Sequence, residues 1–362
     1  MGMKVIYGFK PLFVCEQYVL WSKGYAIFVS DNDAINFDWI CDVPSGKIIS
    51  LFSRIRIFQR LMRLEVFPAV QLDHHTFIVA ARGKLWRLSV ENKKIYFEHS
   101  LRVGTRPLSF VRLEQSALYP SGVYFGEYSE NIEREGVRIY QRCNEGTWRS
   151  VYEFPSGAIA HIHSLVQNPE TGEVWVLTGD MNGESGFWVI DSEFISVRPL
   201  LIGSQEYRAA WMCWRGGKAY YATDSQCQQN SFRALVNDGE GWKATSLVAT
   251  CGPSIYSAKT KKWLAFSTAV EPLASSKNSL RDLFDRKPAP GIVGDDSCIY
   301  LLNQQNELDV IFRGRKDWLP PTLFQFGTVI FPDYNFEDSD YLYCYCIALE
   351  GYDGCTLIKK VA

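Results

Sequence analysis

An acidic residue ends a strand-like run at four successive places in this chain. The spacings between these acidic residues are 53, 44 and 47 residues. A repeat of about 40–50 residues, with several short strands in each unit, is typical of a β-propeller. Equivalent positions of successive blades face one shared axis, so the sequence predicts a ring of carboxylates around that axis. The four residues are Glu127, Asp180, Asp224 and Glu271.

Strand-like runs separated by turn residues dominate the chain, a pattern typical of an all-β fold. We predict a single β-propeller domain over residues 1–362 with about seven four-stranded blades; six blades are the alternative, because 54–64 is hard to place. The run 4–9 is expected to complete the last blade, so that N- and C-terminal strands close the ring and leave no free sheet edge. The predicted blades centre near residues 12–50, 67–100, 107–153, 159–201, 207–249, 254–313 and 322–361.

Two segments stand outside the blade pattern. An insertion at about 272–296 carries a helical pattern at 276–286, and we expect it to form a loop over one face of the propeller. The segment 54–63 holds four arginines in ten residues. We interpret it as a solvated outer strand or a short amphipathic element, with binding of an acidic polymer as the alternative.

Composition and charge argue against several classes of protein. The formal net charge of −2 provides no general electrostatic footprint for nucleic acid. No run of 18 apolar residues occurs, so no membrane span is predicted. The ten cysteines form no C-x-x-C pair, and the first residues lack the apolar segment of a signal peptide. We therefore expect a cytoplasmic protein with reduced thiols.

A second repeat supports the first. Degraded copies of a turn motif, in which an Asx or Gly residue shapes the turn and an aromatic residue packs beneath it, recur along the chain. The final positions of three copies, 148, 196 and 242, are 48 and 46 residues apart. The copies comprise 30–37, Thr147 with Trp148, 189–196 with Asp191, and Asn237, Gly239 and Trp242.

These turn motifs, together with the segments 161–163, 203–209 and 267–272, carry a resemblance to a known family. The stretch 124–235 resembles bacterial sialidase-like propellers with BNR or Asp-box repeats, and the resemblance extends over most of 65–361. Members are glycosyl-hydrolase-like proteins, some encoded beside exopolysaccharide biosynthesis genes, which implies a link to polysaccharides. The Phe/Tyr-Arg-Ile-Pro motif of true sialidases is absent, so we do not expect sialic acid hydrolysis.

Blade geometry predicts which side chains meet at one end of the central axis. The start of an innermost strand and the end of the next strand are neighbours there, and His161 and Arg208 occupy equivalent starts in successive blades. We predict His163 and the four carboxylates as catalytic residues. The predicted substrate-binding residues are His161, Gln205, Tyr207 and Arg208.

Three chemistries are compatible with such a cluster. Paired carboxylates act as acid and base in glycoside hydrolysis. An arginine that binds a uronate carboxylate, with His163 or Tyr207 moving the proton, would serve a lyase. His161 and His163, which point the same way on a strand, would bind a divalent metal together with a carboxylate. The structural alternatives are turn-forming acids, hydrogen-bonded histidines and an Arg208 that only ties two blades together. No other cofactor is predicted.

Two functions follow from these observations. The first is a carbohydrate-active or carbohydrate-binding propeller that works on a bacterial polysaccharide or oligosaccharide, with glycoside hydrolase or polysaccharide lyase chemistry. The second is a non-catalytic propeller that scaffolds glycan or protein interactions in polysaccharide assembly. The expected partners are a glycan or oligosaccharide and other polysaccharide-assembly proteins. Whether the chain is an enzyme stays open at this point.

Overall fold

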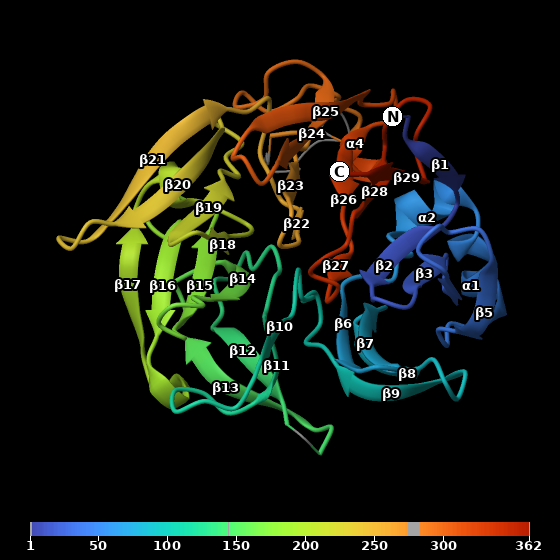
Figure 1. The fold of residues 1–362 in the computed structure, drawn as a ribbon, viewed down its shortest axis with the longest axis horizontal. Helices are drawn as coiled ribbons and strands as arrows, with labels where there is room; N and C mark the ends of the chain where they lie inside the picture. The colour runs from blue at the N-terminus through green and yellow to red at the C-terminus, as the bar shows by residue number, and fades with distance from the viewer. Residues whose placement is uncertain (1, 144, 274–282, 362) are drawn as a thin grey trace.

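Seven β-sheets surround a central axis in the computed structural model, which describes residues 2–143, 145–273 and 283–361 (Figure 1). The chain is therefore a seven-bladed β-propeller, as predicted, and the six-blade alternative is wrong. Blades 2 to 6 each contain four consecutive antiparallel strands, which run outward from the axis. Blade 2 contains β6 (Ala69–Asp73), β7 (Thr76–Ala81), β8 (Lys84–Ser89) and β9 (Lys94–Ser100). Blade 3 contains β10 (Val111–Leu113), β11 (Gly122–Gly126), β12 (Val137–Arg142) and β13 (Trp148–Phe154).

The next three blades carry the predicted site and the insertion. Blade 4 contains β14 (His161–Gln167), β15 (Val174–Gly179), β16 (Gly186–Ile190) and β17 (Val197–Ile202), and the short 3-10 helices η1 (Ser192–Phe194) and η2 (Gln205–Tyr207) flank β17. Blade 5 contains β18 (Cys213–Arg215), β19 (Lys218–Ala222), β20 (Ser231–Asn237) and β21 (Trp242–Ala249). Blade 6 contains β22 (Ser257–Lys259), β23 (Leu264–Ser267), β24 (Asp296–Leu302) and β25 (Leu308–Arg315). The helical pattern expected at 276–286 lies mostly outside the described residues.

Blades 1 and 7 close the ring. In blade 7, the order is β26 (Thr328–Ile330), β28 (Tyr341–Ile347), β29 (Cys355–Lys360) and the N-terminal β1 (Lys4–Tyr7). Strand β1 pairs with β29 from Lys4 opposite Ile358 to Tyr7 opposite Cys355, which confirms closure by the two ends of the chain. Blade 1 contains β2 (Lys10–Val14), β3 (Val19–Lys23), β4 (Ala26–Ser30) and β5 (Phe37–Asp42), with the short β27 (Asp333–Tyr334) parallel to β2.

The hydrophobic core lies between neighbouring blades. Every residue of β15 is buried, whereas most of the outermost β21 is exposed. Inner strands are continuous apolar runs because both of their faces contact an adjacent blade, and each large side chain buried there contributes roughly 1.5–3 kcal/mol. Between blades 4 and 5, the rings of Trp175, Trp214 and Trp242 pack edge to face with centroids 4.9–5.6 Å apart.

The repeated turn motif lies where the third strand of a blade turns into the fourth. This holds for the turns 30–37, 142–148, 190–197 and 237–242. In each of three turns an acid or amide oxygen accepts a backbone N–H: Asp31 from Ile35, Asp191 from Ser196 and Asn237 from Gly239. These bonds shape the turns locally, which explains why the motif repeats with the blade period.

The arginine-rich segment is not an outer strand and is not fully solvated. It follows α1 (Lys47–Ser53) and contains the short helix α2 (Arg56–Met62), both of which lie between blades 1 and 2, and Arg60 is buried. The Arg60 guanidinium forms an ion pair with Asp317 and a second one, at 3.3 Å, with Asp353. It also donates to the carbonyl of Phe324 in α4 (Pro321–Phe324). The segment therefore ties blade 7 to the blade 1–2 connection. Within the described part of the chain, no helix is long and apolar enough to cross a membrane.

Candidate functional site

His161 and His163 lie at the start of β14. This strand is the innermost one of blade 4 (Figure 1). The pairing with β15 shifts here: Ile162 lies opposite Thr178 and Ser164 opposite Leu177, so His163 is the extra residue of a β-bulge. Bulges re-aim side chains next to functional sites. Both histidines are buried, and their Nε2 atoms lie 3.1 Å apart.

The outer nitrogen of each imidazole contacts a backbone carbonyl. His161 Nδ1 lies 2.8 Å from the carbonyl oxygen of Ser129, and His163 Nδ1 lies 2.9 Å from that of Ala209. Because a carbonyl only accepts, these partners assign a hydrogen to each Nδ1. Burial lowers the pKa of His163, which favours its neutral form. The Nε2 atoms of the two rings face each other and Asp180.

Asp180, which follows β15, completes a compact group with these histidines. Its Oδ1 atom lies 3.5 Å from His161 Nε2 and 3.6 Å from His163 Nε2. The Arg208 guanidinium reaches the same Oδ1 at 2.8 Å and approaches Asp224 Oδ2 at 3.7 Å. Arg208 also donates to the backbone carbonyl of Asp180 at 3.2 Å. These distances bring five of the predicted site residues together: His161, His163, Asp180, Arg208 and Asp224.

Two more predicted carboxylates lie near Arg208. Asp224 and Glu271 are buried, and burial raises the pKa of both, with the charge of Arg208 opposing the shift. Gln226 donates to Glu271 at 2.9 Å, whereas Asp224 Oδ1 is buried with no hydrogen-bond partner in the described part of the chain. We call the following residues the axial cluster: His161, His163, Asp180, Arg208, Asp224 and Glu271. Its three carboxyl groups share one close guanidinium, that of Arg208.

Three predicted site residues have other contacts. Glu127 accepts from Arg102 and from the backbone N–H of Arg138, both at 2.9 Å. Its carboxylate is therefore held within blade 3, and the predicted ring of four acids has three members. The Gln205 amide donates to the backbone carbonyl of Asp180 at 2.8 Å. Tyr207, also predicted to bind substrate, packs against the core between blades 4 and 5.

Two residues of the site were missed from the sequence. The Tyr128 ring centroid lies 4.4 Å from that of His161, and the Arg106 guanidinium lies 5.4 Å from the Tyr128 centroid. A backbone bridge between Arg106 and Tyr128 holds this pair in place. Burial strongly raises the pKa of Tyr128, which keeps the phenol protonated. Tyr128 follows Glu127 directly, and its ring lies against His161, whereas the Glu127 carboxylate is bound by Arg102 and the Arg138 backbone.

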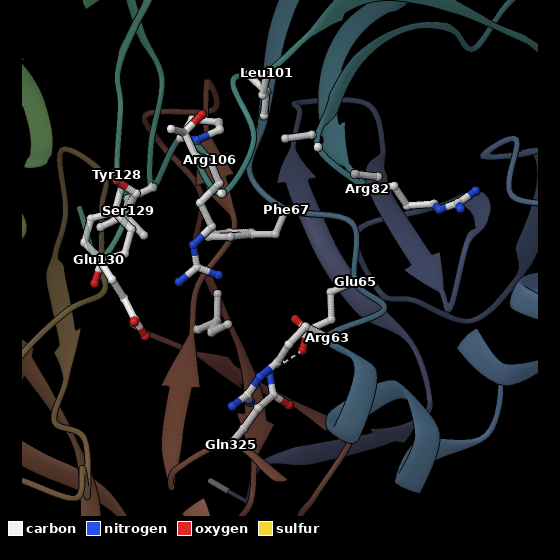
Figure 2. A pocket seen from close by; sticks show the side chains of 18 of the residues that line it. Arg63, Glu65, Phe67, Arg82, Leu101, Arg106, Tyr128, Ser129, Glu130 and Gln325 are labelled. Atoms are coloured by element: carbon white, nitrogen blue, oxygen red, sulfur yellow. Dashed lines mark hydrogen bonds between the residues drawn. The ribbon is translucent and has the colours of Figure 1, made fainter. Parts of the chain in front are cut away.

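A cavity of about 670 Å³ adjoins the axial cluster through Tyr128 and Ser129. Figure 2 shows Arg106 and Glu130 extending into this cavity from one side, while Arg63 and Gln325 lie together with Glu65 at the other. Glu65 is held there by Lys10 and by the Gln325 amide, both at 2.7 Å. The rings of Phe67 and Tyr256 add apolar walls. Small-molecule sites commonly combine this size with aromatic walls and a few polar groups.

Comparison with known proteins shows the fold alone. In sequence, the chain matches no protein-family model and no curated protein. In structure, it is similar to the oligogalacturonate lyase of Vibrio parahaemolyticus, with a TM-score of 0.54 and 8% identity over 99% of this chain and 90% of that one. It is similar to the extracellular domain of a one-component system of B. thetaiotaomicron, with a TM-score of 0.55 and 10% identity over 99% of this chain and 40% of that one. A chain of the mitotic checkpoint complex matches with a TM-score of 0.51 and 10% identity, over 100% and 92% of the two chains.

Proposed function

We propose that this chain cleaves an acidic oligosaccharide or polysaccharide by elimination, in the cavity beside the axial cluster. The observation that carries the proposal is the placement of Arg106 and Tyr128 between a cavity of sugar-binding size and a buried cluster of imidazoles and carboxylates. The likeness to an oligogalacturonate lyase and the sialidase-like motifs of 124–235 support a carbohydrate substrate. Because its ten cysteines are unpaired, we place the protein in the cytoplasm, where its substrates would be oligosaccharides that are made or taken up there.

Elimination from a uronate needs three groups in the protein. A cation next to the sugar carboxylate makes the adjacent C5 proton more acidic, a base removes that proton, and a proton donor protonates the leaving oxygen as the C4–O bond breaks. Arg106 provides the cation, because Arg208 is buried and occupied by Asp180. Tyr128, kept protonated by burial, is placed as the proton donor. Glu130, whose side chain extends into the cavity on the same side as Arg106, is the proton acceptor (Figure 2).

Turnover on a panel of polyuronates and neutral glycans tests this function. We expect ultraviolet absorbance from an unsaturated uronate with the acidic glycans only. Tyr128→Phe should reduce turnover at least about 100-fold while the protein stays folded, since proton transfer is worth about 10²–10⁴-fold. Arg106→Gln should raise KM. Arg198→Gln is the matched control, because Arg198 lies on the outer strand β17, pairs with Glu173 at 3.4 Å and does not line the cavity.

The negative outcomes are distinct. Cleavage of neutral glycans without an unsaturated product would replace elimination by hydrolysis. Calorimetric binding of an acidic glycan without cleavage would favour the non-catalytic scaffold. A protein that neither binds nor cleaves any glycan of the panel would overturn the proposal.

A further inference from the structure

We propose that His161, His163 and Asp180 bind a divalent transition-metal ion at the start of β14. The three facing atoms, two imidazole Nε2 and the carboxylate Oδ1, are separated by 3.1, 3.5 and 3.6 Å. All three lie within 4.8 Å of one another; the two histidines come from β14, and Asp180 directly follows β15. This inference goes beyond the proposed function and does not depend on which substrate the cavity takes.

The triangle of donor atoms has the size that a metal ion requires. The point equidistant from three atoms with these separations lies about 2.0 Å from each, and Zn²⁺ bonds to His nitrogen and Asp oxygen are about 2.0–2.2 Å long. At bonds of about 2.1 Å, the angles at the ion range from roughly 95° to 120°, which is near tetrahedral. One ion can therefore bind all three ligand atoms without a large movement of any side chain.

Hydrogen bonding at the far side of each ring gives a second argument. Both Nδ1 atoms face carbonyl oxygens, Ser129 for His161 and Ala209 for His163. If either imidazole moved its hydrogen to Nε2, its Nδ1 lone pair would face a carbonyl lone pair at under 3 Å. Hydrogen on both Nδ1 atoms leaves both Nε2 atoms as the ligand atoms, and an Nδ1–H bond to a carbonyl is the usual way in which proteins orient a metal-binding histidine.

The charge around the site gives a third argument. Asp180, Asp224 and Glu271 surround Arg208, and Asp224 Oδ1 is buried without a hydrogen-bond partner among the described residues. A dication beside Asp180 would add a second cation to a cluster in which three carboxyl groups share one guanidinium. Arg208 then serves as an outer hydrogen-bond donor that orients the ligating carboxylate.

The ligand chemistry selects the class of ion. Two imidazoles and one carboxylate suit Zn²⁺, Co²⁺, Fe²⁺, Ni²⁺ or Mn²⁺, whereas Mg²⁺ and Ca²⁺ prefer oxygen ligands alone. Three protein ligands leave at least one coordination position for water or substrate. Asp180 is 41% exposed, so that position is reached from the solvent side of the site.

Co²⁺ binding to the chelator-treated full chain is the test, because the visible spectrum of Co²⁺ reports its ligands. We expect one Co²⁺ per chain with a spectrum of nitrogen and oxygen ligands and no thiolate charge-transfer band, and a rise in Tm with Co²⁺ concentration. His163→Ala should abolish this spectrum, and Asp180→Asn should weaken Co²⁺ binding at least about tenfold while keeping the shape of the site. His99→Ala is the control, because His99 packs among Tyr140 and Trp148 in another part of the propeller.

The opposite results are equally clear. Absence of both the spectrum and the Tm shift in the wild-type chain would overturn the inference. So would a thiolate band, or equal binding by Asp180→Asn, because either would place the ion elsewhere. The result is independent of glycan turnover: a chain that binds Co²⁺ but cleaves no glycan refutes only the proposed function. A chain that cleaves glycans without binding Co²⁺ refutes only this inference.

Discussion

Arg208 donates to the Asp180 carboxylate at 2.8 Å and so joins the start of blade 5 to the end of β15 in blade 4. The same guanidinium is the nearest positive charge to Asp224, at 3.7 Å. One side chain therefore ties two blades together and holds the acids of the axial cluster in place.

Replacing Arg208 by Gln should destabilise the fold. Removing one partner of a buried ion pair costs about 3–5 kcal/mol, and the half-exposed Asp180 places the expected loss near the lower end, at about 3 kcal/mol. Urea unfolding measures this change. Adding Asp180→Asn to Arg208→Gln should restore part of the stability, since an unpaired charge is then removed. A single variant as stable as the wild type would show that the pair contributes little.

Gly179→Ala should disturb the site without unfolding the blade. A Cβ at Gly179 would lie 2.8 Å from His163 Cε1 and 3.1 Å from Arg208 Cγ. The imidazole must shift, so Co²⁺ affinity should fall about 10–100-fold, as it does when the support of a ligand is lost. Gly183→Ala is the control, because a Cβ there meets no atom within 4 Å. Equal affinities in the two variants would contradict the assigned position of His163.

Arg60 and Arg54 should respond very differently to substitution by Met. Arg60 is buried and pairs with Asp317 and Asp353, so its loss should cost about 3–5 kcal/mol in the free energy of unfolding. Arg54 is half-exposed and pairs with Asp42 at 3.3 Å, an interaction worth under about 1 kcal/mol. Chemical denaturation of the two variants compares them directly. Similar losses would mean that α2 does not anchor blade 7.

Glu65 should make stability depend on acid pH. Burial opposes its charged form, but the charges of Lys10 and Arg56 outweigh burial and lower the pKa of Glu65 to about 2. Because an exposed Glu titrates near pH 4.5, the unfolded chain binds the proton first. The stabilisation is present above that pH and is lost as the pH falls toward 2, with a total of about 3 kcal/mol.

Urea titrations between pH 6 and 2.5 measure the effect of Glu65. In Glu65→Gln the slope of stability against pH should be smaller over this window, because the amide does not titrate. If the two proteins lose stability in parallel, other carboxylates carry the acid sensitivity.

The blade count and the closure were accessible from the sequence because both depend on local patterns. Turn residues at 30–37 and 237–242 and the apolar runs of inner strands repeat with the blade, and each is formed by neighbours in sequence. The outer strand offered as one alternative for the arginine-rich segment was wrong, because the segment forms the short helix α2, and Arg60 is buried against Asp317 and Asp353, which lie far along the chain.

The period of the chain thus determined that Asp180, Asp224 and Glu271 approach one axis with His161, His163 and Arg208. The tertiary structure alone decided how these side chains meet. The Glu127 carboxylate lies in blade 3 because Arg102 and the Arg138 backbone N–H bind it there. The next residue, Tyr128, lies beside His161. The bulge at His163 and carbonyls from two other segments aimed both Nε2 atoms at Asp180. Such orientations depend on hydrogen-bond partners contributed by neighbouring blades, and no local pattern in the sequence records them.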